Sequence, residues 1–88
     1  MRYDFCKGDI VASFDSMKDA MAWAEKHGYI WLEGFSTSTD IVGENTEYFA
    51  DPMDLPEGIT VDGIDGHENE ILDYYGLGYE PCIIPREV

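Results

Sequence analysis

Carboxylates are the residues of this chain whose number and spacing could carry chemistry. From Glu33 to Pro85 the sequence holds thirteen acidic residues and no lysine or arginine. They are Glu33, Asp40, Glu44, Glu47, Asp51, Asp54, Glu57, Asp62, Asp65, Glu68, Glu70, Asp73 and Glu80. Residues 1–32 are nearly balanced in charge, so the formal net charge of -14 arises mainly in one region. Carboxylates can bind metals, transfer protons or stand in for phosphates, and their spacing distinguishes these roles.

Neither metal binding nor acid-base catalysis is favoured by the spacing. The segment 62–68 superficially resembles a calcium loop, but an EF-hand needs an oxygen ligand at its third position, where this chain has Ile64. His67 could pair with Glu68 or Glu70, yet a histidine on the apolar face of a short helix is more typical of a structural residue. We therefore expect no enzymatic activity, no metal and no cofactor.

The acids recur in two groups, every three or four residues in the first group and mostly every three in the second. The first group is Glu44, Glu47, Asp51, Asp54 and Glu57, and the second is Asp62, Asp65, Glu68, Glu70 and Asp73. Each DNA strand presents a phosphate about every 3.4 Å along its axis. An array of carboxylates can therefore occupy the positions where a DNA-binding protein binds phosphates. These ten acids are the predicted partner-binding residues of a DNA mimic.

Aromatic side chains are interspersed among the acids. A few buried aromatic anchors supply most of the binding energy of a typical protein interface, whereas carboxylates at the rim steer the encounter. The predicted surface anchors are Tyr48, Tyr74 and Tyr79. The aromatic residues expected in the core are Phe35, Phe49 and Tyr75.

The length of 88 residues and the 44% hydrophobic content predict a single folded acidic domain, residues 1–88. The N-terminus has no signal-peptide pattern, and no apolar stretch approaches the roughly 18–20 residues of a membrane span. A cytoplasmic location is therefore expected, without membrane contact. In that reducing compartment Cys6 and Cys82 are expected to be buried thiols and not a disulfide.

The elements that must position the acids follow from local patterns. Residues 2–6 and 10–14 are β-prone and predict a hairpin. Ser16 precedes an amphipathic segment as a helix cap, and Gly28 ends that helix. The aromatic and β-branched run 29–36 predicts a third strand.

The C-terminal half continues with shorter elements. A loop is expected at 37–40, a strand at 46–50 and a short strand at 59–61. Asp65 is predicted to cap a second helix that ends at Gly76, and 79–84 to pair as an edge strand. This order predicts an α+β fold with a small, mainly antiparallel sheet, one amphipathic helix packed on it and a second short helix near the C-terminus.

In size, charge and lack of catalytic groups, the chain resembles the small acidic inhibitors that phages and mobile elements use against CRISPR effectors, restriction enzymes and repair enzymes. The resemblance is to this anti-CRISPR and anti-restriction class and not to a family. No motif is shared and no residue role is transferred. The resemblance implies a stoichiometric inhibitor that mimics DNA and needs no cofactor. Its implied partner is a basic, nucleic-acid-binding protein.

Two alternative interpretations remain. The chain could be an acidic adaptor or antitoxin-like protein that binds a basic patch without imitating DNA, or a domain adapted to high salt. Mimicry requires the acids on one continuous face, whereas adaptation to salt spreads them evenly. Direct binding of nucleic acid is not expected, because only five lysines and arginines are available to contact phosphates.

Overall fold

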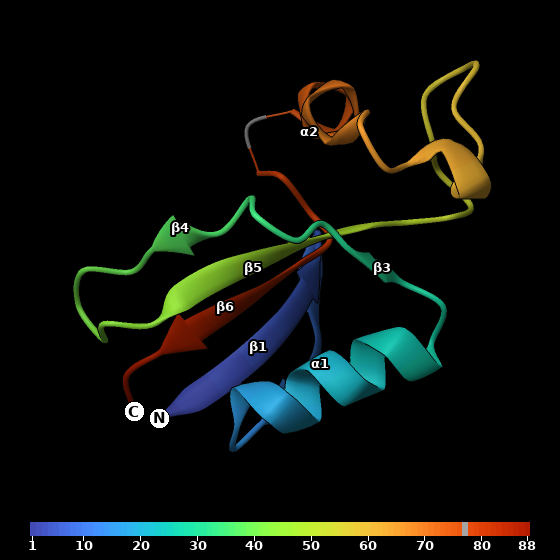
Figure 1. The fold of residues 1–88 in the computed structure, drawn as a ribbon. Helices are drawn as coiled ribbons and strands as arrows, with labels where there is room; N and C mark the ends of the chain where they lie inside the picture. Colours follow the sequence, from blue (N-terminus) through green and yellow to red (C-terminus); the bar gives the residue numbers. More distant parts are fainter. Residues whose placement is uncertain (77) are drawn as a thin grey trace.

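The computed structural model describes residues 1–76 and 78–88, which form an α+β fold (Figure 1). The elements in chain order are β1 (Arg2–Lys7), β2 (Asp9–Phe14), α1 (Met17–Lys26), β3 (Ile30–Trp31), β4 (Thr37–Ser38), β5 (Asn45–Ala50), the 3₁₀ helix η1 (Val61–Gly63), α2 (Glu68–Tyr75) and β6 (Cys82–Arg86). The predicted fold class is confirmed. Within residues 1–76 and 78–88, no helix is long and apolar enough to cross a membrane.

The sheet is antiparallel, with the strand order β2-β1-β6-β5-β3 and with β4 also paired to β5. The predicted hairpin is confirmed as β1 and β2. The prediction of an edge strand at the C-terminus is wrong, because β6 lies between β1 and β5. Its Pro85 lacks a backbone N–H, which favours edge positions. The pairing with β5 involves only Cys82 and Ile83, so Pro85 lies beyond it.

Helix α1 begins as its sequence predicts. The Ser16 hydroxyl accepts a hydrogen bond from the Asp19 backbone N–H at 3.1 Å, which satisfies a free donor of the first turn. Asp19 in the first turn and Lys26 in the last complement the helix dipole. Ala20 and Ala24 are fully buried, so the helix packs closely against one face of the sheet.

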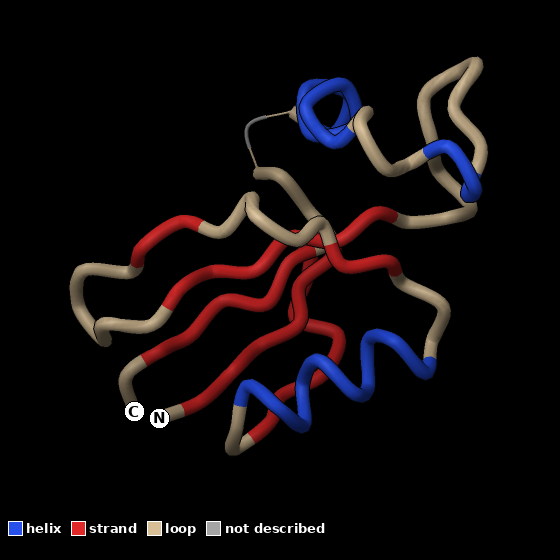
Figure 2. The backbone as a smooth tube through the Cα atoms, viewed as in Figure 1, coloured by secondary structure: helices blue, strands red, loops and turns tan. Residues whose placement is uncertain are grey.

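The sheet carries an apolar cluster on each face. Successive side chains of a strand point to opposite faces, so neighbouring residues belong to different clusters. Phe5 and Ile83 pack under α1, together with Phe49. The neighbouring residues Cys6 and Cys82 point to the other face, where they contact the segment that contains η1 and α2. Figure 2 shows these two coverings on opposite sides of the strands.

The cysteines occupy adjacent strands and are free, as predicted. Cys6 and Cys82 are register partners in β1 and β6, and both are buried. Burial raises the pKa of both thiols, that of Cys82 to about 12. Both groups are therefore protonated and unreactive at neutral pH.

Three short elements differ from the sequence predictions. Strand β3 covers only Ile30–Trp31, because the chain turns at Gly34, which has a φ of 90°. The expected loop at 37–40 contains strand β4, paired with β5. The expected strand at 59–61 is wrong, since residues 61–63 form η1.

The start of α2 also differs. Asp65 does not cap it: the helix begins at Glu68, and the cap residue His67 makes no side-chain cap hydrogen bond. Gly66, with a φ of 90°, turns the chain between Asp65 and the helix, and its backbone N–H donates to the Glu68 carboxylate. The predicted end of the helix at Gly76 is confirmed.

Candidate functional site

Residues 51–76, here called the acidic lobe, form the most distinctive surface of the protein. The lobe follows β5, contains η1 and α2, and has no lysine or arginine. In Figure 1 it lies at the top of the view, and α1 lies at the bottom with the sheet between them. The acidic lobe and the two lysines of α1, Lys18 and Lys26, therefore lie on opposite sides of the sheet.

The lobe contains eight of the ten predicted acids, and seven of these eight reach the surface. Asp54, Glu57, Asp62, Asp65, Glu70 and Asp73 are exposed, and Glu68 is half-buried. The other predicted acids are distributed differently. Glu44 directly precedes β5 and Glu47 lies in it, so the first predicted group is divided between two parts of the molecule.

Apolar residues of the lobe hold the acids outward. Ile64, Ile71 and Leu72 are buried and pack against Leu32 and Tyr48 of the sheet region. Ile71 and Leu72 make one side of α2 face the sheet, which leaves Glu70 and Asp73 in solvent. The hydrophobic effect thus orients a highly charged segment, despite the mutual repulsion of its carboxylates.

The prediction of Asp51 as a partner-binding residue is wrong, because this residue is only 4% exposed. Its carboxylate forms an ion pair with Lys7 of β1 and accepts a hydrogen bond from the Met53 backbone N–H at 2.9 Å. Its own backbone N–H donates to the Tyr75 hydroxyl at 2.8 Å. Asp51 therefore anchors the lobe to the sheet and does not belong to an exposed binding surface.

The pKa of Asp51 follows from these contacts. Burial alone would raise it, but the hydrogen bonds from Lys7 and Met53 outweigh burial and hold the pKa below its ordinary value. Because the pKa of Asp51 is lower in the folded than in the unfolded state, its ionised carboxylate stabilises the fold. This contribution is fully present above the unfolded-state pKa of about 4 and is lost as the pH falls through the folded-state pKa.

Replacement of Asp51 by asparagine is therefore expected to destabilise the protein in a pH-dependent way. At pH 7 Asp51→Asn should lower the free energy of unfolding by about 1–2 kcal/mol, since Lys7 is partly exposed and water screens the pair. Below about pH 4 the difference from wild type should shrink. Urea unfolding at both pH values measures this, with exposed Asp73→Asn as the control. A difference independent of pH would contradict the assigned role.

The predicted tyrosine anchors are also divided. Tyr48 is 8% exposed and shares a 2.6 Å hydrogen bond with the Thr37 hydroxyl, so its prediction as a surface residue is wrong. Tyr74 is 52% exposed, and its hydroxyl donates to Asp54 at 2.9 Å, which raises the pKa of Tyr74. Tyr79 is half-buried and packs edge-on against Tyr48.

The aromatic residues expected in the core behave more uniformly. Phe49 is 1% exposed, and Phe35 and Tyr75 are partly buried against the core. Tyr74 is therefore the predicted aromatic residue best placed to touch a partner.

A buried carboxylate that the sequence analysis did not single out forms ion pairs with both arginines. Asp4 of β1 is fully buried and lies 2.9 Å from Arg2 and 2.8 Å from Arg86. It also accepts a hydrogen bond from the Ser13 hydroxyl at 2.7 Å. Arg2 and Arg86 are register partners, so the Asp4 carboxylate offsets the repulsion between two like charges on adjacent strands.

The remaining cations lie away from the acidic lobe or are already paired. Lys7 is held by Asp51. Lys18 and Lys26 are exposed on α1 and form no ion pair with a residue that the structure describes. Within the lobe, His67 Nδ1 lies 3.0 Å from Glu70 Oε1 on the surface. The carboxylates of the lobe consequently have no lysine or arginine partner on the lobe itself.

This unbalanced surface predicts that salt stabilises the fold. Like charges in the lobe repel one another, and salt screens them over a Debye length of about 8–10 Å at physiological ionic strength. The melting temperature should therefore rise by several degrees between low salt and about 0.5 M sodium chloride. Differential scanning calorimetry measures this. A melting temperature that does not change with salt would mean that the carboxylates are too far apart to interact.

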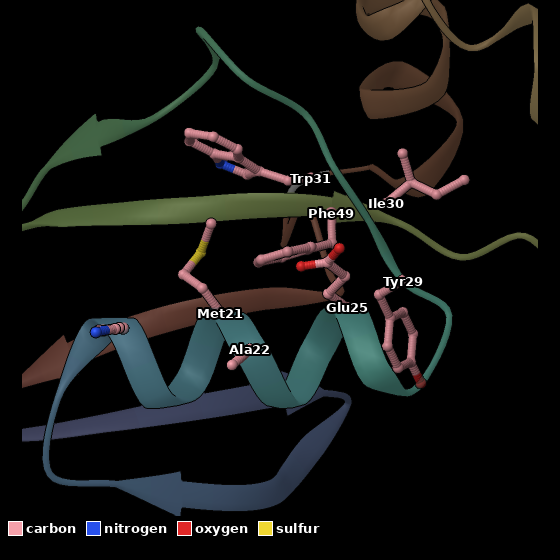
Figure 3. Close-up of a pocket in the computed structure, with 8 residues that line it drawn as sticks. Met21, Ala22, Glu25, Tyr29, Ile30, Trp31 and Phe49 are labelled. Atoms are coloured by element: carbon pink, nitrogen blue, oxygen red, sulfur yellow. The ribbon is translucent and has the colours of Figure 1, made fainter.

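The structure also reveals an apolar groove that the sequence analysis missed. It has a volume of about 600 Å³ and lies between α1 and β3. Figure 3 shows Met21 of α1 pointing toward Trp31 of β3, with Phe49 beside Met21. Its charged lining residues are Lys18 and Glu25. Trp31 is 43% exposed, and only its place in a predicted strand was visible in the sequence.

Among residues 1–76 and 78–88, no group of three or more histidine, cysteine or acidic side chains is arranged to hold a metal ion. Comparisons with protein families, curated proteins and solved structures give no match to this chain.

Proposed function

We propose that this protein is a stoichiometric inhibitor that mimics DNA and blocks the nucleic-acid-binding surface of a basic DNA-binding enzyme. The observation that carries the proposal is the acidic lobe, where seven carboxylates project from one segment that has no lysine or arginine. In this proposal the target is a CRISPR effector, a restriction enzyme or a repair enzyme in the cytoplasm. No cofactor takes part.

Charge and size support this function. A surface of one sign attracts a surface of the opposite sign over a distance and accelerates association. The longest dimension of the protein is 40 Å, which matches about twelve phosphate steps along one DNA strand. The backbone that carries the lobe carboxylates is held by the packed residues Ile64, Ile71 and Leu72, so the segment does not have to fold on binding, which lowers the entropic cost of association.

An acidic adaptor that does not imitate DNA is the second candidate. The exposure of Tyr74 and Trp31 favours it, because aromatic anchors can bind a basic protein outside its DNA site. General adaptation to high salt is less well supported, since the lobe lacks cations while α1 carries two exposed lysines.

A competition assay tests the proposal. Purified representatives of the three target classes are titrated with this protein in the presence of fluorescent cognate DNA. We expect displacement of DNA from at least one representative, at one inhibitor per DNA site and with an apparent affinity that falls as salt rises. A target that binds this protein and its DNA simultaneously, with neither weakening the other, would contradict mimicry and favour the adaptor.

The protein alone is expected not to bind DNA or RNA. Its five lysines and arginines face an excess of acids, and three of the five are already paired with Asp4 or Asp51. Gel-shift measurements at physiological salt should show no complex up to about 100 μM protein, a concentration at which many DNA-binding proteins already bind non-specifically. Micromolar binding to either nucleic acid would argue against the proposed function.

A further inference from the structure

Trp31 is an exposed aromatic residue whose orientation is fixed. It lies in β3, an edge strand of two residues, and is a register partner of Phe49 in β5. Its indole N–H donates to the Glu47 carboxylate at 3.0 Å. A tryptophan that is oriented in this way offers a large apolar surface at little entropic cost on binding.

One side of Trp31 faces apolar surface. The groove between α1 and β3 is lined by Met21, Ala22, Tyr29 and Phe49 in addition to Trp31 (Figure 3). With a volume of about 600 Å³, it is large enough for one or two apolar side chains of a partner.

The other side of β3 borders acidic surface. A second cleft, of about 270 Å³, lies between β3 and the acidic lobe, and Ile30 and Trp31 line both hollows. Its carboxylates are Glu33, Asp62, Asp65 and Glu68. Ile64 and Leu32 supply apolar walls, against which the methylene groups of a long basic side chain can pack.

We propose that the two hollows form one docking site for a basic amphipathic segment of the partner. An apolar side chain of that segment enters the groove of Trp31, and a neighbouring arginine or lysine enters the acidic cleft. Charge complementarity favours this occupant, because the carboxylates of the cleft attract a basic side chain. The apolar groove and the carboxylate-lined cleft adjoin along the single strand β3, so one segment can reach both. The inference rests on the proposed function, because it takes the partner to be a basic protein.

A second copy of this chain fits the site less well. Dimerisation would bring together two molecules with a formal charge of -14 each. A self-complementary contact at β3 would also place the carboxylates of one cleft near those of the other. Like charges juxtaposed across an interface oppose association, whereas arginine and lysine satisfy the same carboxylates.

Peptide binding tests this inference directly. The probe is a capped twelve-residue peptide with four arginines and one central phenylalanine, in a background of alanine and serine. We expect saturable binding that shifts the NMR signal of the Trp31 indole N–H. The signal of Trp23, which stacks on His27 and does not line the groove, should move less. Replacing the phenylalanine by serine, or the arginines by glutamine, should weaken binding at least tenfold.

Two protein variants make the test specific. Trp31→Ala removes the anchor surface, and Ala22→Arg fills the groove from an exposed position of α1 with a good helix former. Both should weaken peptide binding at least tenfold while α1 remains folded by circular dichroism. Val11→Ala, at a similarly exposed position on the opposite edge strand β2, should change affinity less than twofold.

Three results would overturn the proposal. They are absence of saturable binding, equal affinity with and without the phenylalanine, and full binding by both Trp31→Ala and Ala22→Arg. The proposed function fails separately: if DNA competition persists in the Trp31→Ala and Ala22→Arg variants, only the docking site is wrong. If no DNA-binding protein is displaced from DNA, mimicry is wrong whatever the peptides show.

Discussion

Reversal of three carboxylates in the acidic lobe is expected to abolish competition with DNA. The variant Asp62→Lys, Glu70→Lys, Asp73→Lys should weaken target binding at least a hundredfold in the DNA-displacement assay. The three side chains are exposed on η1 and α2 and take no part in the core. Truncation of one member of a charge pair that is buried in an interface costs roughly 2–5 kcal/mol of binding free energy. Because about 1.4 kcal/mol corresponds to a tenfold change in affinity, this range includes a hundredfold loss.

Single reversals should have much smaller effects. An exposed ion pair contributes about 0–1 kcal/mol, so Asp62→Lys alone should weaken binding less than about fivefold. The matched control is the triple variant Asp9→Lys, Asp15→Lys, Glu87→Lys, which changes the net charge by the same amount outside the lobe. Equal losses in the two triple variants would mean that overall charge, and not the lobe, governs binding.

The fold was largely predictable because several of its elements are encoded locally. The Ser16 cap, the hairpin at residues 2–14 and the glycine at the end of α2 each act through their neighbours in sequence. The position of β6 was not predictable in this way. A run of apolar residues such as Cys82–Ile84 has the same appearance in an edge and in a central strand, and only its long-range partners β1 and β5 decide between them.

The candidate site was predictable in outline but not residue by residue. The absence of lysine and arginine from residues 33–85 indicated an acidic surface, and the structure exposes most of the acids of that region. Burial of Asp51 and Tyr48 was invisible, because it depends on Lys7 and Thr37, which are distant in sequence. The same is true of the groove at Trp31, whose walls come from three separate elements.

Replacement of Asp4 is expected to have the largest effect on stability. Asp4→Ala removes two charge-assisted contacts and the hydrogen bond to Ser13, and leaves Arg2 and Arg86 opposite each other on adjacent strands. A hydrogen bond to a charged group contributes roughly 1.5–3 kcal/mol. Because the two arginines are partly exposed, we expect a total loss of about 3 kcal/mol. That corresponds to a fall in melting temperature of more than about 10 °C for a domain of this size.

Thermal unfolding and DNA displacement together separate the role of Asp4 in the fold from any role in binding. Asp4 lies in the sheet and not in the acidic lobe, so the Asp4→Ala protein that remains folded should displace DNA as wild type does. The control combines Asp4→Leu with Arg2→Met and Arg86→Met, since apolar residues can replace a buried ion-pair network at little cost, and it should recover most of the lost stability. If Asp4→Ala melts at the wild-type temperature, the network does not stabilise the sheet. If it unfolds as expected but the apolar triple variant recovers nothing, the loss has another cause than unpaired charge.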